Sequence, residues 1–166
     1  MTKGTSNKAA RILLVVGRLA LAAVFLFAAY AKLKPPTGLP WSLSSVNTSL
    51  AMFALQVDSY ELLPERAVSA VAHLLPPFEL LLGLWLLSGI ALRLSSVASS
   101  LLLGGFLSVM VRTYMRGLEI NCGCFGPGER LGPVTLLRDS SLLLLAVAVM
   151  IGAFLLRRAR VEESLS

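Results

Sequence analysis

The sequence predicts an all-α fold, an integral membrane antiparallel bundle of four transmembrane helices with an amphipathic interfacial helix in the first outer loop. The first observation is composition, because 56% of the 166 residues are hydrophobic and only 14% are charged. A soluble domain carries about 25% charged residues, so lipid must cover part of this chain. The second observation is four apolar runs, near residues 12–33, 67–92, 94–114 and 134–156. Each is close to the roughly 20 residues that span a bilayer, and we treat residues 1–166 as a single membrane domain.

The first apolar run follows a polar, basic segment, residues 1–10, which we expect to be a short disordered tail. Only Arg18 and Lys32 interrupt the run, and the Pro35-Pro36 pair ends the helix because proline lacks an amide donor. The alternative is a cleaved secretory signal peptide, since Ala29-Tyr30-Ala31 resembles a cleavage site. The run is longer than the roughly 7–15 residues of a signal core, which favours an uncleaved anchor.

The longest non-spanning stretch, residues 37–65, follows this first span. Within it Leu50, Phe53 and Val57 repeat at the spacing of three and four residues that is typical of a helix with one apolar face. We therefore expect an amphipathic helix over residues 49–63 that lies at the membrane surface and is stopped by Pro64.

The other three spans carry local features of their own. The Pro76-Pro77 pair lies inside the second run and should kink its helix. Small residues, which let helices approach closely in lipid, recur at every fourth position of the third run: Ser96, Ser100, Gly104 and Ser108. We interpret this stripe as a packing face. A glycine-rich loop, residues 116–133, precedes the fourth run.

The distribution of basic residues predicts the topology. Four spans place both termini on one side. The loops of the opposite side carry Lys34, Arg66, Arg116 and Arg130 among several acidic residues, whereas more basic residues lie in the tails and the short second turn: Lys3, Lys8, Arg11, Arg93, Arg157, Arg158 and Arg160. Because lysine and arginine are retained on the cytoplasmic side, we expect both termini to be cytoplasmic and the loop of residues 116–133 to be extracytoplasmic. The net charge of +6 thus reports on topology, and no basic-aromatic pattern indicates a nucleic-acid partner.

The only two cysteines, Cys122 and Cys124, lie in this loop with one glycine between them. Bridged cysteines need Cα atoms about 4.4–6.8 Å apart, which neighbours two apart reach only in a bent backbone, and Gly123 supplies that freedom. The closed ring is so small that it adds at most ~1.6 kcal/mol of stability. A strained, exposed disulfide is easily reduced, so the pair is predicted to exchange rather than to stabilise.

Two alternatives remain open for these cysteines. Both can be reduced, inert thiols at a tight turn that the glycines form. Two thiolates also suit Cu(I) or zinc, but the only histidine is His73, on the outer half of the second span. That set is too small to predict a metal site, and no residue pattern predicts another cofactor.

Charged residues inside the spans form the second informative set. Glu79 follows the proline pair and lies toward mid-membrane, where a carboxylate costs roughly 2.5–3.5 kcal/mol and must be protonated or paired. Its candidate partners are Lys32, Arg112 and Arg138, with Asp139 as a further acid at the same level. We expect a polar cluster beneath the cysteine loop, where a positive neighbour favours the thiolate. The alternative is that these charges reach the interface independently.

Several short motifs occur together in an order that resembles the methylamine utilisation protein MauE family, a relative of the DoxX-like four-helix membrane proteins. The motifs are Lys32-Leu33-Lys34-Pro35, Tyr60-Glu61-Leu62-Leu63-Pro64, Leu75-Pro76-Pro77-Phe78-Glu79-Leu80-Leu81-Leu82-Gly83, Arg116-Gly117, Cys122-Gly123-Cys124-Phe125-Gly126 and Arg138-Asp139. The cysteine element is the most specific of them.

The resemblance implies a multi-pass protein of the bacterial inner membrane. The family's namesake is thought to help process, transport or mature the disulfide-rich small subunit of methylamine dehydrogenase in the periplasm. Carried over, Cys122 and Cys124 become the redox pair, and four polar residues become its family-pattern neighbours: Glu79, Arg116, Arg138 and Asp139.

Three functions are compatible with these observations. The first is thiol-disulfide redox maturation of a periplasmic client, as a possible oxidoreductase accessory that exchanges with a thioredoxin-like protein or a disulfide-containing client. The second is a non-redox membrane accessory or scaffold whose Cys-Gly-Cys loop is only a tight turn. The third is a small transporter with Glu79 as a proton site, which the lack of an internal repeat makes the weakest.

Overall fold

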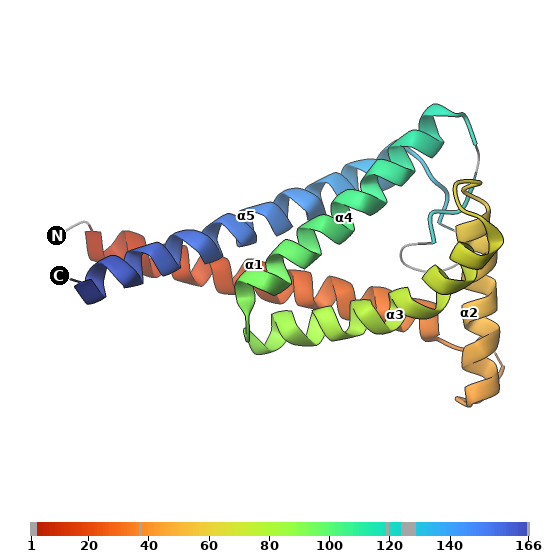
Figure 1. Cartoon of the computed structure of the whole chain (residues 1–166), viewed down its shortest axis with the longest axis horizontal. Helices are drawn as coiled ribbons and strands as arrows, with labels where there is room; N and C mark the ends of the chain where they lie inside the picture. Colours follow the sequence, from red (N-terminus) through yellow and green to blue (C-terminus); the bar gives the residue numbers. More distant parts are fainter. Residues whose placement is uncertain (1–2, 37, 119, 124–128, 166) are drawn as a thin grey trace.

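The structure, a computed structural model, is described over residues 3–36, 38–118, 120–123 and 129–165, with side chains described between residues 10 and 156. Five helices form this part of the chain: α1 (Lys3–Leu33), α2 (Leu43–Asp58), α3 (Glu65–Ser88), α4 (Leu92–Met115) and α5 (Pro133–Leu165). Figure 1 shows four of them running lengthwise, while α2 lies across one end, and the two termini lie together at the opposite end.

Four helices are long and apolar enough to cross a membrane, which confirms the predicted fold class. The candidate spans are Ala10–Leu33, Glu65–Ser88, Leu92–Met115 and Pro133–Leu156. The expected disordered tail was wrong, because α1 begins at Lys3. Once an apolar span has formed, each added residue gains a hydrogen bond without a new nucleation cost, so the helix extends into the polar segment. In the same way α5 continues from the span to Leu165.

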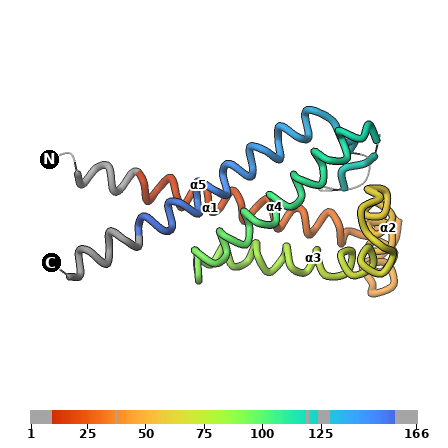
Figure 2. The backbone as a smooth tube through the Cα atoms, turned by 45° about the horizontal axis from the view of Figure 1, so that its top comes forward, coloured from red at the N-terminus to blue at the C-terminus, as the bar shows by residue number. Residues whose placement is uncertain are grey.

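The helices pack as two close pairs, α1 with α3 and α4 with α5, with α1 also contacting α5. Figure 2 shows the α4–α5 pair diverging from the α1–α3 pair toward the α2 end. The central apolar cluster comes from α1, α3 and α5: Leu21, Ala22, Phe25, Leu82, Leu86, Ala146 and Val149. The α1–α3 approach depends on Gly83, where an added Cβ would lie 2.8 Å from Leu26 Cγ.

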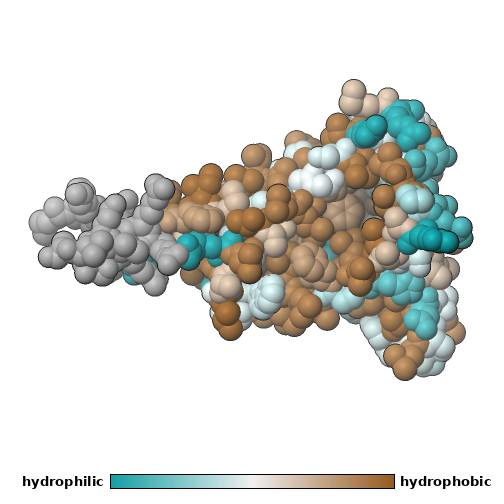
Figure 3. Space-filling view, viewed as in Figure 1, coloured by the Kyte–Doolittle hydropathy of each residue, from teal (hydrophilic) through white to brown (hydrophobic). Residues whose placement is uncertain are grey.

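The outer surface of the bundle is mostly hydrophobic. In each candidate span only 22–33% of the most apolar window is buried within the chain, and Figure 3 shows a brown, hydrophobic surface along the length of the bundle. Water would not solvate so much exposed apolar area on a monomer, because soluble proteins expose contiguous patches of only a few hundred Å². The chain is therefore a multi-pass membrane protein with lipid as its surroundings.

The interfacial helix exists, but its predicted bounds were wrong. It begins six residues earlier, at Leu43, because Ser42 and Ser45 form a reciprocal capping box at its start. It ends at Asp58, and Glu61 then takes a left-handed conformation with φ +52°. Pro64 therefore does not stop this helix and instead caps the start of α3.

Two further expectations concern α3 and α4. Helix α3 stays helical through Pro76 and Pro77, and its yellow N-terminal part turns away from the rest of the helix in Figure 1. The predicted packing stripe of α4 is only partly buried, since Ser96 is buried but Ser108 is exposed. The buried serines, Ser95, Ser96 and Ser99, donate to carbonyls on their own helix, which satisfies their hydroxyls inside the membrane.

Candidate functional site

The loop between α4 and α5 folds back on itself as a short hairpin. The Cys122 amide donates to the Glu129 carbonyl at 2.6 Å, and the Leu131 amide donates to the Ile120 carbonyl at 2.8 Å. Asn121 and Arg130 form an antiparallel bridge between the two sides. Cys124, the second member of the predicted redox pair, lies outside the described residues. The hairpin therefore fixes the backbone of Cys122 against Glu129 on its opposite side.

Cys122 is buried, with 3% of its surface exposed, in a small cluster with Tyr60, Met110 and Leu131. Its Sγ lies 3.9 Å from the Met110 Sδ of α4, and its carbonyl accepts a 2.7 Å hydrogen bond from the Tyr60 hydroxyl, which follows α2. Cys122 is thus held by groups from before α3, from α4 and from its own hairpin. The sequence did not predict this burial, which arises because Tyr60, from the turn after α2, and Met110 of α4 pack on Cys122.

Gly123 is required by both its backbone and its surroundings. Its φ is +71°, in the left-handed region that other residues rarely adopt. An added Cβ would lie 2.9 Å from Gln56 Oε1, so α2 approaches the cysteine element closely. The expected bent backbone at this glycine is present.

The start of α5 positions the next polar group. Pro133 occupies the first helical turn, where its missing amide costs nothing. The Thr135 hydroxyl accepts from the Gly132 amide at 2.9 Å and donates to the Gly132 carbonyl at 2.7 Å. One turn later Arg138 donates through Nε to Asp139 Oδ1 at 2.9 Å and through a terminal nitrogen to Glu129 Oε1.

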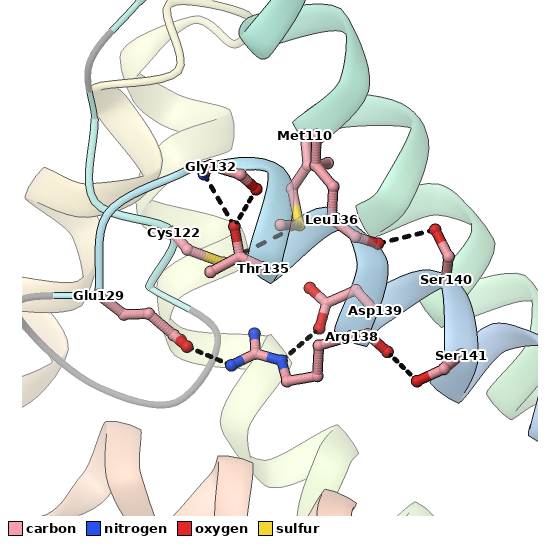
Figure 4. A network of polar contacts seen from close by, with 10 residues as sticks. All are labelled: Met110, Cys122, Glu129, Gly132, Thr135, Leu136, Arg138, Asp139, Ser140 and Ser141. Carbon is pink, nitrogen blue, oxygen red and sulfur yellow. Dashed lines mark hydrogen bonds and ion pairs between the residues drawn. The ribbon is translucent and has the colours of Figure 1, made fainter.

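Figure 4 shows Arg138 reaching from α5 to Glu129, on the strand of the hairpin opposite Cys122. Since the Glu129 carbonyl also accepts from the Cys122 amide, one residue connects the sulfur-bearing strand to the membrane helix. The Glu129 partnership was not predicted. Glu129 lies in the loop, and only the hairpin fold brings its carboxylate back to α5.

A buried ion pair lies between α1 and α3. Lys32 Nζ is 2.9 Å from both carboxylate oxygens of Glu79, and each residue is 4% exposed. The lysine also lies 5.4 Å from the centre of the Phe53 ring of α2, in cation–π geometry. Among the three predicted partners of Glu79, the structure selects Lys32, because α1 is the helix packed most closely on α3.

Asp139 belongs to the same buried polar centre. Lys32, Glu79 and Asp139 line one cavity of about 30 Å³, with apolar side chains forming the rest of its wall. That volume holds roughly one or two water molecules. Through Asp139 the centre continues to Arg138 and then to the hairpin, so part of the predicted polar cluster lies between the helices and connects to the cysteine loop.

Arg112 and Arg116 lie outside this buried centre. Arg112 is exposed on the last turn of α4. Arg116 pairs with Glu61 at 3.5 Å, where both side chains are largely exposed. Their predicted support of the cysteine pair stays a prediction. His73 is also exposed, and its Nδ1 lies 2.8 Å from the Ser69 carbonyl. Within the described ranges, no three histidine, cysteine or acidic residues lie close enough to hold a metal ion.

One protein-family model matches most of the chain. The model of the methylamine utilisation protein MauE family matches residues 10–152, from the start of the first span into the last one. The chain belongs to the MauE family. No match was found among curated proteins or among solved structures. The MauE match covers the Lys32–Glu79 pair, the cysteine loop and the Arg138-Asp139 pair together, so the whole candidate site lies within the family domain.

Proposed function

We propose that this MauE protein takes part in the thiol-disulfide maturation of a periplasmic client, with Cys122 and Cys124 as the exchanging pair. The observation that carries the proposal is the placement of Cys122. Its backbone accepts from Tyr60 and donates to Glu129, and its sulfur lies against Met110. These three contacts hold Cys122 in a defined position within the hairpin. Family membership supports a role in methylamine utilisation, and the resemblance to the family's namesake implies the small subunit of methylamine dehydrogenase as the class of client.

The exchange transfers two electrons between the cysteine pair and the client. A client thiolate attacks one sulfur of the Cys122–Cys124 disulfide, which forms a mixed disulfide and releases the other cysteine as a thiolate. A second client thiolate then attacks the mixed disulfide, so that the client leaves oxidised and both loop cysteines are reduced. The reverse sequence reduces or isomerises a client disulfide. A thioredoxin-like protein is the class of partner that performs this chemistry.

The burial of Cys122 adds a requirement to this function. Because only 3% of the residue is exposed, a protein partner cannot reach its sulfur while the hairpin stays closed. Glu129 and Arg138 form an ion pair that holds the strand opposite Cys122, and both side chains are partly exposed. We infer that loss of this pair opens the hairpin toward the partner.

The orientation of the site is part of the proposal. The basic residues near the termini favour a cytoplasmic location for both ends, and α2 and the cysteine hairpin lie at the opposite end of the bundle in Figure 1. The cysteines then face the periplasm from the inner membrane, where disulfides persist.

Trapping of the mixed disulfide tests the function. In cells that express Cys122→Ser or Cys124→Ser, the remaining cysteine should stay bonded to the client, and a heavier species should be resolved without reductant and lost with it. The double variant should yield no such species and should impair maturation of the client's disulfides. Normal client maturation in the double variant would overturn the proposal.

The second candidate is a scaffold role, which the packing of Cys122 in an apolar cluster specifically favours. In that case Cys122→Ala would support client maturation as well as the unchanged chain does, while Met110→Ala, which leaves both sulfurs in place, would impair it. The redox proposal predicts that Cys122→Ala abolishes client maturation, because the reacting sulfur is removed.

A further inference from the structure

A second cavity lies toward the opposite end of the bundle, away from α2. It has a volume of about 770 Å³ and lies among α1, the α3–α4 turn and α5. Three arginines line it, Arg11, Arg18 and Arg93. The remaining described lining is apolar apart from the backbone at Gly89, and Figure 3 shows hydrophilic surface beside the grey terminal segments at this end.

Arg18 reaches from α1 to the turn between α3 and α4. Its guanidinium lies against Gly89, the left-handed residue that ends α3, and a Cβ there would be 2.1 Å from Arg18 Nη1. Its Nε is buried and has no hydrogen-bond partner within the described part of the chain. The negative end of the α3 dipole offers only about half a charge, which does not balance a full guanidinium.

The other two arginines add to this positive charge. Arg93 lies in the first turn of α4, and its guanidinium carbon is 5.7 Å from the centre of the Phe154 ring of α5. That contact orients the guanidinium plane without neutralising its charge. Arg11 is exposed on α1 at the cavity edge. None of the described residues that line the cavity is acidic, so three cationic side chains surround a space that the described side chains leave without a carboxylate.

We propose that this cavity binds a phosphate-bearing anion, either the headgroup of an anionic phospholipid or a small free phosphate compound. Guanidinium groups present a planar fork that matches phosphate oxygens in pairs. Basic pockets between transmembrane helices are a recurring site for anionic headgroups. The buried Arg18 Nε supplies a hydrogen-bond donor without a partner among the described residues, and the apolar wall from Leu14, Val15 and Val97 suits an acyl chain beside it. This site is independent of the cysteine chemistry.

Lipid binding is measured on the purified full chain in detergent by native mass spectrometry, with phosphatidylglycerol and phosphatidylcholine as probes. The unchanged chain should retain phosphatidylglycerol preferentially. Arg18→Gln and Arg93→Gln should each weaken that binding about fivefold, the effect of one arginine near an anionic headgroup. Arg66→Gln is the matched control, because Arg66 is an exposed arginine at the other end of α3, and it should bind as the unchanged chain does.

A calorimetric titration with inorganic pyrophosphate distinguishes the two sources of phosphate. Binding of phosphatidylglycerol that pyrophosphate does not displace identifies a lipid headgroup, and saturable pyrophosphate binding that is lost in Arg18→Gln identifies a free phosphate compound. Far-UV circular dichroism checks that each variant is folded, and Arg93→Gln tests the site if Arg18→Gln does not fold. Equal retention of both lipids together with no pyrophosphate binding, or equal binding by Arg93→Gln and the unchanged chain, would overturn the proposal.

Discussion

The buried Lys32–Glu79 pair should contribute strongly to stability through the penalty of leaving one charge alone. Both carboxylate oxygens lie 2.9 Å from the lysine nitrogen. At that distance two unit charges attract by about 6 kcal/mol at an effective dielectric constant near 20. The desolvation of two charges that are each 4% exposed offsets much of this attraction. Removing a single partner takes the ion pair from the other residue in a cavity whose remaining wall is apolar apart from Asp139, and we expect Glu79→Gln or Lys32→Met to cost roughly 3–5 kcal/mol.

The double variant Lys32→Met with Glu79→Leu should recover most of that loss, because no isolated charge remains. Unfolding of the detergent-solubilised protein, followed by circular dichroism against a denaturing detergent, gives the free energies. The exposed Arg116–Glu61 pair is the matched control, and Glu61→Gln should change stability by less than about 1 kcal/mol. The reasoning would be refuted if the single variants lose no more free energy of unfolding than this control, or if the double variant loses as much as the two single variants together.

Three further predictions test the packing and the loop. Gly83→Ala should destabilise the protein, since its Cβ would lie 2.8 Å from a side chain of α1. Gly105→Ala is the control, because no atom lies within 4 Å of an added Cβ there, and it should be neutral or stabilise by up to about 1 kcal/mol. Unfolding in denaturing detergent compares the two variants. Gly123→Ala should cost about 1–2 kcal/mol because its φ is +71°, and an unchanged unfolding midpoint would contradict that strain. Glu129→Gln should raise the alkylation rate of Cys122 roughly fivefold, as expected for loss of a partly exposed ion pair worth about 1 kcal/mol, and an unchanged rate would show that this pair does not hold the hairpin closed.

The four spans could be predicted because a bilayer imposes a length on apolar segments, and each run met it independently of tertiary contacts. The bounds of α2 could not be predicted from apolar spacing alone. The apolar spacing of Leu50, Phe53 and Val57 continues to Tyr60, which lies in the turn after the helix and packs in the cluster that holds Cys122. The capping box at Ser42 was the local signal for the true start, and the pattern of apolar residues does not contain it.

The candidate site was predictable only in part for the same reason. Glu79 needed a partner on energetic grounds, but the choice among Lys32, Arg112 and Arg138 depends on which helices are neighbours. Arg112 was excluded from the buried centre because it lies on the exposed side of the last turn of α4. The Glu129 partnership arises because the hairpin folds back toward α5, and the burial of Cys122 arises from its packing against Tyr60 and Met110. No periodicity in the sequence reports these contacts.

The most direct test of the central claim is the reduction potential of the Cys122–Cys124 pair in the purified protein. The protein is equilibrated with glutathione buffers of increasing oxidised fraction, and an alkylating mass tag then counts the free thiols. An exchanging pair should form its bond in a single two-electron transition above about −300 mV, the level below which structural disulfides typically fall. Two thiols that stay reduced in every buffer, or a bond that forms only far below that potential, would contradict the account.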